Sequence, residues 1–498
     1  MRKKIVLLAA SAALASLVLW SIRGVGDWYP MHDSTHLARI LLMRETWMNG
    51  QIPALWASHI NHGLGYPLFH FYAPLFHTLS AIFLGVLASP TTALKLSLWV
   101  AAFVGSYGVM LLTRRWGRLA ALVSAFAFAL SPYMAVSLYV RGSYSEYLSL
   151  ALLPWVFLAT EKIKSGRGVV LASLALTLFV LSHNLIPIVA LPMILLWMVY
   201  HNYRLPQYIV YTILLTLGLS SWFVVPLIME RGFTIADQIA RTTSYQLHFV
   251  EPWQLWNSTW GFGGSALGVE DGMSFKLGKI QIIFGLLGMA TALYKKNRQL
   301  SLISLFLLVS FWLTTASSRF LWDASSTLQI VQFPWRTLGL LAFYLSILTG
   351  YLVSQIGSQQ ARRGFAVVSV VALLFLNLKY FTPQSIVASP LDNPNIDLTQ
   401  IEDISTVVPE FMPVWLTKSN LNIIGSTVLP YAYYPTWEVE LDGRPAMTYP
   451  SASGQLAFNN PANSSNYLVR QSHTRLENIS LLVSLLALII AIKFYVKK

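Results

Sequence analysis

The chain has 498 residues, of which 55% are hydrophobic and 11% are charged, whereas a soluble globular protein carries roughly 25% charged residues. This composition excludes an ordinary water-soluble enzyme and indicates a chain that is solvated largely by lipid. The absence of cysteine from the sequence excludes disulfides, thiolate metal sites and cysteine nucleophiles. The net charge of +14 does not indicate nucleic-acid binding, because the basic residues fall in short clusters between apolar runs, as cytoplasmic anchors do.

The chain begins with Met-Arg-Lys-Lys and an apolar run over residues 5–22. A basic start followed by an apolar stretch also describes a signal peptide. The run is about 18 residues long, which is enough to cross a hydrocarbon core of roughly 30 Å, and it continues past the small residues at 9–15. We therefore expect an uncleaved first membrane span, with the signal peptide as the alternative.

Further apolar runs follow at 67–88, 92–113, 119–138, 147–160, 168–183, 185–200, 207–228, 281–294, 300–317, 336–356, 365–380 and 478–496. Between them, clusters of Lys and Arg are expected on the cytoplasmic side, near residues 114–118, 162–167, 204, 295–298, 362–363 and 493–498. These clusters alternate correctly if every run from residue 92 onward crosses once. Run 67–88 then has no crossing to make, so we expect it to lie in, or dip into, the outer interface. The chain would cross about 12 times, with the N- and C-termini both cytoplasmic.

This topology leaves four long segments outside the membrane, at 23–91, 229–280, 318–335 and 381–477. The last differs from the others because it holds alternating stretches such as Trp437 to Leu441, followed by the turn signal Asp442-Gly443. The sequence therefore predicts an all-α polytopic membrane domain over 1–380, a small exterior β-rich, sandwich-like domain over 381–477, and a C-terminal transmembrane helix over 478–498.

The first exterior segment contains six of the ten histidines, at positions 32, 36, 59, 62, 70 and 77. A helix is expected to begin near Asp33 and to end before Gly50. Its spacing allows His32, Asp33 and His36 to share a face with Arg39. A carboxylate beside imidazoles at a helix N-terminus could bind a divalent ion, or act as a base towards a hydroxyl. The alternative is an interfacial helix with a solvated polar face and an Asp cap.

Ionisable groups near a bilayer are costly and are therefore functional candidates, and three more places carry them at the outer ends of spans. Arg141 and Glu146 share one turn. They could be functional groups, and the alternative is an ion pair that only stabilises the turn. His183 and Asn184 follow an apolar run. They could be functional groups, and the alternative is a helix cap or a buried polar pair whose hydrogen bonds are satisfied. Arg336 begins a span, where its forked donors could meet a phosphate or could simply anchor the helix.

Nine motifs in order carry a resemblance that spans nearly the whole chain: HDSTHLAR, GQIPALW, GLGYPLFHFYAPL, RGSYSEYLSLALLPW, LSHNL, the loop WGFGGS…EDGMSFKLG, QFPWR, PEFMP and YYPTWEVELDG. With these motifs the chain resembles the bacterial integral membrane proteins labelled "6-pyruvoyl-tetrahydropterin synthase-related", which are assigned to the GT-C glycosyltransferase superfamily. The glycine-rich loop resembles no Walker or dinucleotide motif, and is read as a mobile lid or as a flexible connection.

The resemblance implies a GT-C-like glycosyltransferase that moves a sugar from a polyprenyl-phosphate carrier at the outer face of the bacterial cytoplasmic membrane. By this resemblance, Asp33 matches the acidic residue of the first loop, as general base or as part of a metal site with His32 and His36. Glu146 matches the region of a second acidic group. The donor phosphate would be held by Arg336, Arg141 and His183, and the remaining substrate-binding candidates are His36, Arg39 and Asn184. A divalent ion such as Mg²⁺ or Mn²⁺ is the one cofactor considered.

Two other classes of function stay open. A lipid or polysaccharide transporter or flippase would place paired broken helices and polar groups near the bilayer midplane, whereas the strongest cluster here lies at the outer edge. A non-catalytic envelope assembly protein would use the exterior β-domain to recruit partners and would tolerate the change Asp33→Asn. In the enzyme reading the partners are the lipid-linked sugar, the bilayer, and a glycan, lipid or protein acceptor of the envelope, with no nucleic acid.

Overall fold

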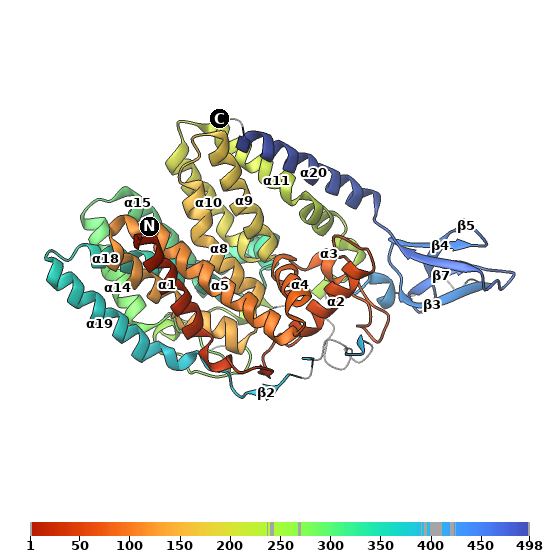
Figure 1. Cartoon of the computed structure of the whole chain (residues 1–498), viewed down its shortest axis with the longest axis horizontal. Coiled ribbons are helices and arrows are strands. Elements are labelled where there is room, and N and C mark those ends of the chain that lie inside the picture. The colour runs from red at the N-terminus through yellow and green to blue at the C-terminus, as the bar shows by residue number, and fades with distance from the viewer. Residues whose placement is uncertain are drawn as a thin grey trace.

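The structure, a computed structural model, describes residues 2–236, 238–239, 244–266, 270–389, 391–392, 396–398, 411–418, 423 and 425–496. These residues form a body of helices with a group of short strands projecting from one end (Figure 1). The helices of the body are α1 (Arg2–Val18), α2 (His36–Met48), α3 (Leu68–Phe71), α4 (Leu75–Leu87), α5 (Pro90–Thr113), α6 (Arg118–Ala129), α7 (Pro132–Ala135), α8 (Tyr144–Thr160), α9 (Gly166–Ser182), α10 (Ile186–Asn202), α11 (Pro206–Met229), α13 (Gln254–Asn257), α14 (Lys279–Tyr294), α15 (Arg298–Thr314), α16 (Arg319–Ala324), α17 (Ser326–Gln329), α18 (Leu338–Ser354), α19 (Gln359–Asn377) and α20 (Arg475–Val496).

Several of these helices are long and apolar enough to cross a bilayer. Within the described residues there are five by length and composition: Pro90–Trp116, Pro206–Met229, Pro334–Ser354, Gln359–Tyr380 and Arg475–Val496. The number rises to seven if two bent pairs each count as one span, the bends being 47° before Pro132 and 89° before Ala316. Shorter apolar helices account for other predicted runs, including Gly166–Ser182 and Ile186–Asn202. The helical class is thus confirmed, whereas the predicted count of about twelve crossings is not.

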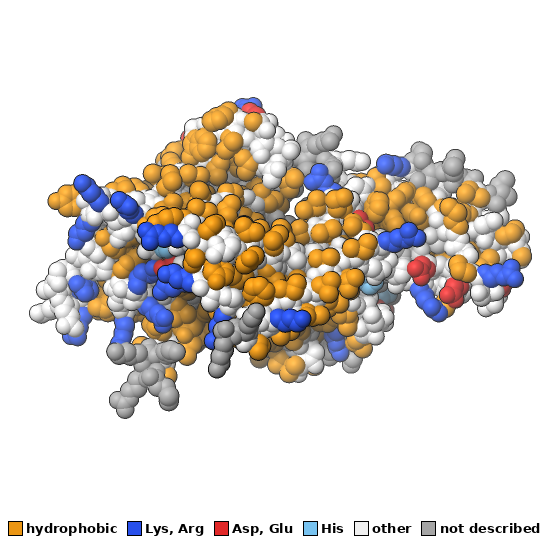
Figure 2. All heavy atoms as spheres, turned by 90° about the horizontal axis from the view of Figure 1, so that it is seen from above, with side chains coloured by type: hydrophobic (Ala, Val, Ile, Leu, Met, Phe, Trp, Pro, Cys, Tyr) orange, Lys and Arg blue, Asp and Glu red, His pale blue; other side chains and the backbone are white. Residues whose placement is uncertain are grey.

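Basic turns and candidate site residues alternate along the chain at opposite helix ends. Helix α8 begins just after Arg141 and ends before Lys162, α9 ends before His183, and α10 ends before Arg204. Figure 2 shows Lys and Arg side chains gathered at the end of the body opposite the strands, with hydrophobic side chains covering the middle. The positions expected to be functional therefore lie at helix ends away from the basic turns, and which side of the membrane they face stays a prediction.

The predicted run 67–88 is not one helix in the structure. It divides into α3 and α4, because Pro74 occupies the N-cap of α4 and lacks the N–H that a continuous helix would need. Helix α4 packs between α2 and α5, and Ser80 donates a 2.8 Å hydrogen bond to Ser97 of α5. The break at residues 72–74 turns His70 and Tyr72 away from the direction of α4, and both side chains take part in the clusters described below.

The strands of the C-terminal part form two antiparallel three-stranded sheets, ordered β3-β7-β6 and β5-β4-β8. Their bounds are β3 (Ser426–Ala432), β4 (Trp437–Leu441), β5 (Arg444–Ala446), β6 (Thr448–Pro450), β7 (Gln455–Asn459) and β8 (Tyr467–Gln471). Leu441 pairs with Arg444 across Asp442 and Gly443, whose φ angles of 50° and 75° suit a tight hairpin turn. The turn signal and the alternating strand before it are therefore confirmed. A further two-stranded pair joins β1 (Asp27–Trp28) to β2 (Val387–Ala388).

Helix α20 returns from the strands along α11, as Figure 1 shows. Ser221 of α11 donates a 2.7 Å hydrogen bond to the Ser480 carbonyl, and Ser484 donates one of 2.9 Å to the Gly218 carbonyl. A Cβ atom at Gly218 would lie 2.8 Å from the Ala487 side chain, so the two helices are in close contact. This contact fixes the start of α20, and with it the end of the β-sheets, against the end of α11.

Candidate functional site

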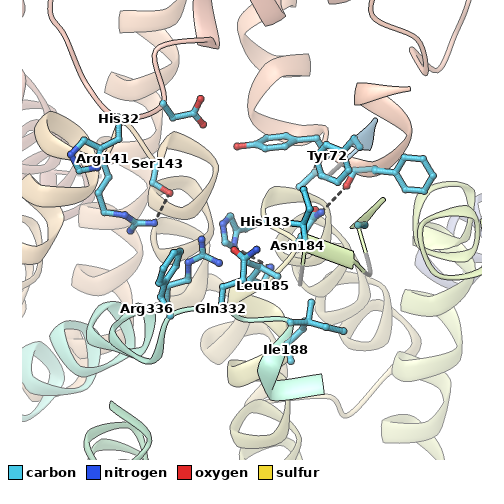
Figure 3. Close-up of a pocket in the computed structure, with 18 of the residues that line it drawn as sticks. His32, Tyr72, Arg141, Ser143, His183, Asn184, Leu185, Ile188, Gln332 and Arg336 are labelled. Carbon is cyan, nitrogen blue, oxygen red and sulfur yellow. Dashed lines mark hydrogen bonds between the residues drawn. The ribbon is translucent and has the colours of Figure 1, made fainter. Parts of the chain in front are cut away.

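A cavity of about 1130 Å³ opens where the site-bearing helix ends meet. Its wall combines the segment between α1 and α4, the turn before α8, the α9–α10 turn, the end of α11 and the segments before α14 and α18. In Figure 3 the guanidinium groups of Arg141 and Arg336 and the ring of His183 are directed towards one space, which Tyr72 faces from the other side. The polar lining includes His32, Asp33, Arg39, Arg141, His183 and Arg336. The structure thus brings the predicted residues of four distant motifs to one cavity.

A backbone pairing places Asp33 beside Arg141. The N–H groups of His32 and Asp33 donate to the carbonyls of Val140 and Arg141, at 3.1 and 3.0 Å. The chain then turns at Gly142, whose φ of 64° is a left-handed conformation that suits glycine. A Cβ atom there would lie 2.5 Å from the Met31 sulfur, so a larger residue would also push the two segments apart.

The Asp33 carboxylate is held by two donors and still faces the cavity. Arg39 donates to Oδ2 at 3.1 Å and Thr35 donates to Oδ1 at 2.8 Å. The Asp33 side chain is 30% exposed, whereas that of Arg39 is 3% exposed. Burial alone would raise the pKa of Asp33, but the Arg39 charge and the Thr35 hydrogen bond outweigh it and hold this pKa well below its ordinary value. Asp33 is therefore a fixed carboxylate at neutral pH.

His36 lies behind this carboxylate and does not line the cavity. Its Nε2 contacts the Gly142 carbonyl and its Nδ1 lies 3.2 Å from Nε2 of His77. Burial is the main reason that the pKa of His36 falls to about 4. A neutral His36 that donates from Nε2 and accepts at Nδ1 satisfies both contacts. His36 thus orients the segment that carries Asp33, with a partner 41 positions away in the sequence.

Glu146 is fully buried and pairs with Arg141. Arg141 donates to its two oxygens at 2.8 and 2.9 Å, and Tyr133 donates to Oε1 at 2.7 Å. The guanidinium also lies over the ring of Trp335, 4.5 Å from the ring centre. Glu146 is not part of the cavity wall, whereas Arg141 is. The ion-pair alternative is therefore the geometry observed, and Glu146 positions Arg141.

His183 has the capping role that the sequence left open as its alternative. Its Nδ1 accepts the backbone N–H groups of Leu185 and Ile186, at 3.2 and 3.0 Å, at the start of α10. Burial lowers its pKa to about 3, so the ring is neutral and its proton is on Nε2, which is free to donate. Asn184 donates to the Phe71 carbonyl at 2.7 Å, and its Oδ1 is buried without a hydrogen-bond partner. Both residues line the cavity.

Arg336 lines the cavity and forms no ion pair with a carboxylate among the described residues. It donates from NH1 to the Val331 carbonyl at 2.9 Å, and its Nε is buried without a hydrogen-bond partner. Its guanidinium lies 5.0 Å from the Phe333 ring centre. Arg336 is partly buried and lacks a counter-ion in the part of the chain that the structure describes, so an anion in the cavity would stabilise its charge. Its role in anion binding stays a prediction.

The predicted metal set of His32, Asp33 and His36 is brought together only in part: Nε2 of His36 lies 3.6 Å from Oδ2 of Asp33, but the three do not form a group close enough to hold one ion. The His32 Nε2 contacts the Phe262 carbonyl at 3.0 Å, both nitrogens of His36 have the contacts given above, and Asp33 pairs with Arg39. Among the described residues, the group whose atoms lie close enough to hold an ion is a different one, formed by His70, Glu230 and Glu477. No part of the cavity wall comes from these three residues.

Sequence reasoning missed several residues of the site. Tyr72 lies under the Arg39 guanidinium at 4.6 Å, Trp335 lies under Arg141, and Thr35 holds Asp33. No local pattern marks these partners. By contrast, Thr474 and Glu477 match the S/T-x-x-E capping box that precedes an apolar run, and that signal was available in the sequence.

The glycine-rich loop forms one wall of the cavity through Gly264, Ser265 and Met273. The N–H of Gly263 donates to the carbonyl of Gly272 at 2.9 Å. A Cβ atom at Gly272 would lie 2.8 Å from the Gly263 Cα, so the two strands of the loop approach as closely as glycine allows. The His32 ring reaches this loop at Phe262. Its role as a lid stays a prediction.

Comparison with known proteins identifies the family of this chain but does not identify a reaction. A family model described as "6-pyruvoyl-tetrahydropterin synthase related domain; membrane protein" matches residues 69–384. The chain belongs to this family. Its matched part contains Arg141, Glu146, His183 and Arg336, whereas Asp33 and the two C-terminal sheets lie outside it. This PTPS-related chain is therefore a membrane protein, and its apolar helices agree with that description.

Among solved structures, this PTPS-related chain is similar to one titled "Crystal Structure of ArnT from Cupriavidus metallidurans bound to Undecaprenyl phosphate". The two are 14% identical, the likeness covers 80% of this chain and 76% of that chain, and the TM-score is 0.39. A likeness at this level carries no argument about activity. No curated protein matches the chain.

Proposed function

We propose that this protein is a GT-C-type glycosyltransferase that moves a sugar from a polyprenyl-phosphate donor to an acceptor at the outer face of the membrane. The cavity would hold the donor phosphate, and Asp33 would receive the acceptor. The observation that carries the proposal is the partly buried guanidinium of Arg336, which has no carboxylate partner among the described residues, in a cavity that also presents Arg141 and a neutral, donating His183.

The charges of the cavity support an anionic ligand. Among Arg39, Arg141 and Arg336, the first pairs with Asp33 and the second with Glu146, whereas Arg336 has no carboxylate partner among the described residues. A phosphate would accept from Arg336 and from the Nε2 of His183, and Arg141 would add a second guanidinium at the cavity wall. A phosphate that leaves with the polyprenyl chain develops negative charge, and fixed donors at that place stabilise the transition state.

The apolar part of the wall supports a lipid chain on the donor. Leu185, Ile188 and Leu227 line the same cavity, and α10 and α11 carry exposed apolar residues beyond it. In a ligand with one phosphate and a long isoprenoid tail, the phosphate would contact the cations of the cavity and the tail would contact its aliphatic side chains. A soluble nucleotide sugar would leave the apolar wall without a partner.

Asp33 is suited to orient an acceptor hydroxyl. Its carboxylate stays ionised and accessible, and the Arg39 and Thr35 contacts fix its direction. A pKa far below neutrality makes it a weak base, so it would accept the proton late, when the attacking hydroxyl has become acidic. Glu146 would act by positioning Arg141. No metal ion is needed for either role.

The test is the effect of Arg336→Gln on lipid-phosphate binding. Loss of charge-assisted hydrogen bonds worth about 1.5–3 kcal/mol should weaken binding of decaprenyl phosphate by roughly 10- to 150-fold. Arg336→Lys should restore part of the affinity, because it returns the charge without the fork. Binding would be measured by native mass spectrometry or by fluorescence in detergent.

Two controls separate an anion site from a general effect. Arg319→Gln changes an arginine that is 59% exposed and lies outside the cavity wall, and it should leave binding unchanged. Decaprenol, which lacks the phosphate, should bind equally to the wild type and to Arg336→Gln. Equal binding of decaprenyl phosphate to both proteins would remove the proposed phosphate site.

Activity should also respond to pH through Arg39. In the wild type, the depressed pKa of Asp33 keeps the acid limb of the transfer rate below about pH 4. Arg39→Gln removes the charge that lowers this pKa, while burial continues to raise it, so the acid limb should move up to about pH 5 or above. The rate would be measured between pH 4.5 and 8 with polyprenyl-phosphate-linked sugars and an envelope extract. An unmoved acid limb would exclude Asp33 as the titrating group.

A further inference from the structure

Three buried ionisable side chains meet outside the cavity. They are His70 of α3, Glu230 at the end of α11 and Glu477 in the first turn of α20, and they are 2%, 5% and 4% exposed. The Nε2 of His70 lies 2.9 Å from Oε2 of Glu230, and its Nδ1 lies 2.6 Å from Oε1 of Glu477. One ligand atom of each residue lies within 4.8 Å of the others. These three residues are more than about 150 positions apart in the chain. Their separation is on the order of a domain length, yet they converge on one point.

Thr474 directs the two carboxylates towards this point. Its hydroxyl donates to Oε1 of Glu230 at 2.6 Å, and its backbone N–H donates to Oε2 of Glu477 at 2.6 Å. One oxygen of each carboxylate is thereby engaged, and the other oxygen is left facing His70. Such hydrogen bonds behind the ligand atoms are what orients carboxylates in metal sites.

The inward-facing atoms have no hydrogen-bond partner. The contacts of His70 with Glu230 and Glu477 are short but lack hydrogen-bond geometry, since Nε2 of His70, Oε2 of Glu230 and Oε1 of Glu477 are all buried and unsatisfied. The hydroxyl of Tyr434, a residue 1% exposed, is buried without a partner as well. The Tyr434 ring lies beside the cluster, with its centre 5.9 Å from that of the His70 ring. Buried polar atoms are nearly always satisfied, so this cluster points to a ligand.

The charge of the cluster identifies the ligand as a cation. The two buried carboxylates carry two negative charges, which a single imidazole could not balance even if it were protonated, and uncompensated buried charge is strongly unfavourable. A divalent ion neutralises them. One imidazole nitrogen with two carboxylate oxygens is a ligand set that Zn²⁺ accepts, with a fourth position for water or a hydroxyl. We propose that His70, Glu230 and Glu477 form a structural Zn²⁺ site, which Mn²⁺ could also occupy.

The ion would join the helical body to the C-terminal sheets. Helices α3 and α20 and the C-cap of α11 each supply one ligand, and Tyr434 belongs to an apolar cluster with Trp56, Phe71 and Trp437 that spans the segment between α2 and α4 and the strands. Phe71 and Leu227, close in sequence to His70 and Glu230, line the cavity. The site would thus hold one wall of the cavity in place, and it does not depend on the proposed sugar transfer.

The experiment measures metal bound to the full-length protein, purified in detergent without a polyhistidine tag. After extraction with a chelator and dialysis against Zn²⁺, mass spectrometry of the elements should find about one ion per chain. Removal of the ion should lower the thermal unfolding midpoint, and Zn²⁺ should restore it. A wild type that retains no Zn²⁺ or Mn²⁺, with a midpoint that the chelator leaves unchanged, would overturn the proposal and indicate an imidazolium held between two carboxylates.

Variants locate the ion. Glu230→Gln and Glu477→Gln should each lose most of the bound Zn²⁺, whereas Glu45→Gln should keep it. Glu45 is the matched control because it also contacts a histidine, His59 at 3.0 Å, outside this cluster. Zn²⁺ at the wild-type level in either cluster variant would overturn the assignment. If the variants do not fold, Co²⁺ is added to the metal-free wild type and its visible absorption is measured. Absence of ligand-field bands from bound Co²⁺ would also overturn the proposal.

Discussion

Replacing Asp33 by asparagine is expected to lower sugar transfer by about 10²- to 10⁴-fold, while lipid-phosphate binding stays near the wild-type level. The amide keeps the size of the side chain but cannot take up the proton of an acceptor hydroxyl. Because Arg39 loses its charged partner, a stability loss of about 1–3 kcal/mol is also expected. Transfer would be followed with polyprenyl-phosphate-linked radiolabelled sugars and an envelope extract as acceptor, and binding with decaprenyl phosphate.

The control for this variant is Asp27→Asn, which changes an aspartate of the same exterior segment. Asp27 lies in β1 and does not line the cavity, so transfer should be unaffected. Transfer by Asp33→Asn at the wild-type rate would remove Asp33 from the mechanism and would favour the non-catalytic assembly role. Loss of both transfer and decaprenyl phosphate binding would instead indicate that Asp33 supports the cavity.

Local signals in the sequence predicted those parts of the structure that local physics decides. The strand Trp437 to Leu441 and its Asp442-Gly443 turn are set by alternation and by backbone conformation. The separation of basic turns from candidate site residues follows from where charge is tolerated. His183 caps a helix because its ring can accept the first N–H groups of α10.

Tertiary pairing decided the rest, and no local pattern reports it. His36 meets His77 across 41 positions, and that contact takes the nitrogen that the predicted metal site required. The candidate metal ligands Glu230 and Glu477 stand alone in the sequence, and only the packing of α20 along α11 brings them to His70. The count of about twelve spans is not confirmed, because bends before Pro132 and Ala316 and several short apolar helices leave the number of crossings in the described residues open.

The same physics gives a large expected effect on stability at Arg141. Arg141→Gln leaves the fully buried Glu146 carboxylate without its counter-ion. This is expected to lower the free energy of unfolding by about 3–5 kcal/mol. Glu146→Gln should cost less, because Arg141 lines the cavity and can be solvated there. The double variant should be more stable than the sum of the two single losses predicts, since no charge is left unpaired.

The measurement is unfolding of the purified protein by SDS titration, for the two single variants and the double variant. The matched control is the pair of Arg115 and Glu161, which makes the same two-point contact at 2.7 and 2.6 Å but lies among the basic turns, with the arginine 30% exposed. Its disruption should cost no more than about 1 kcal/mol. Equal losses for both pairs, or strictly additive losses at Arg141 and Glu146, would show that the buried pair is not a coupled unit, and Glu146 would then need a role other than positioning Arg141.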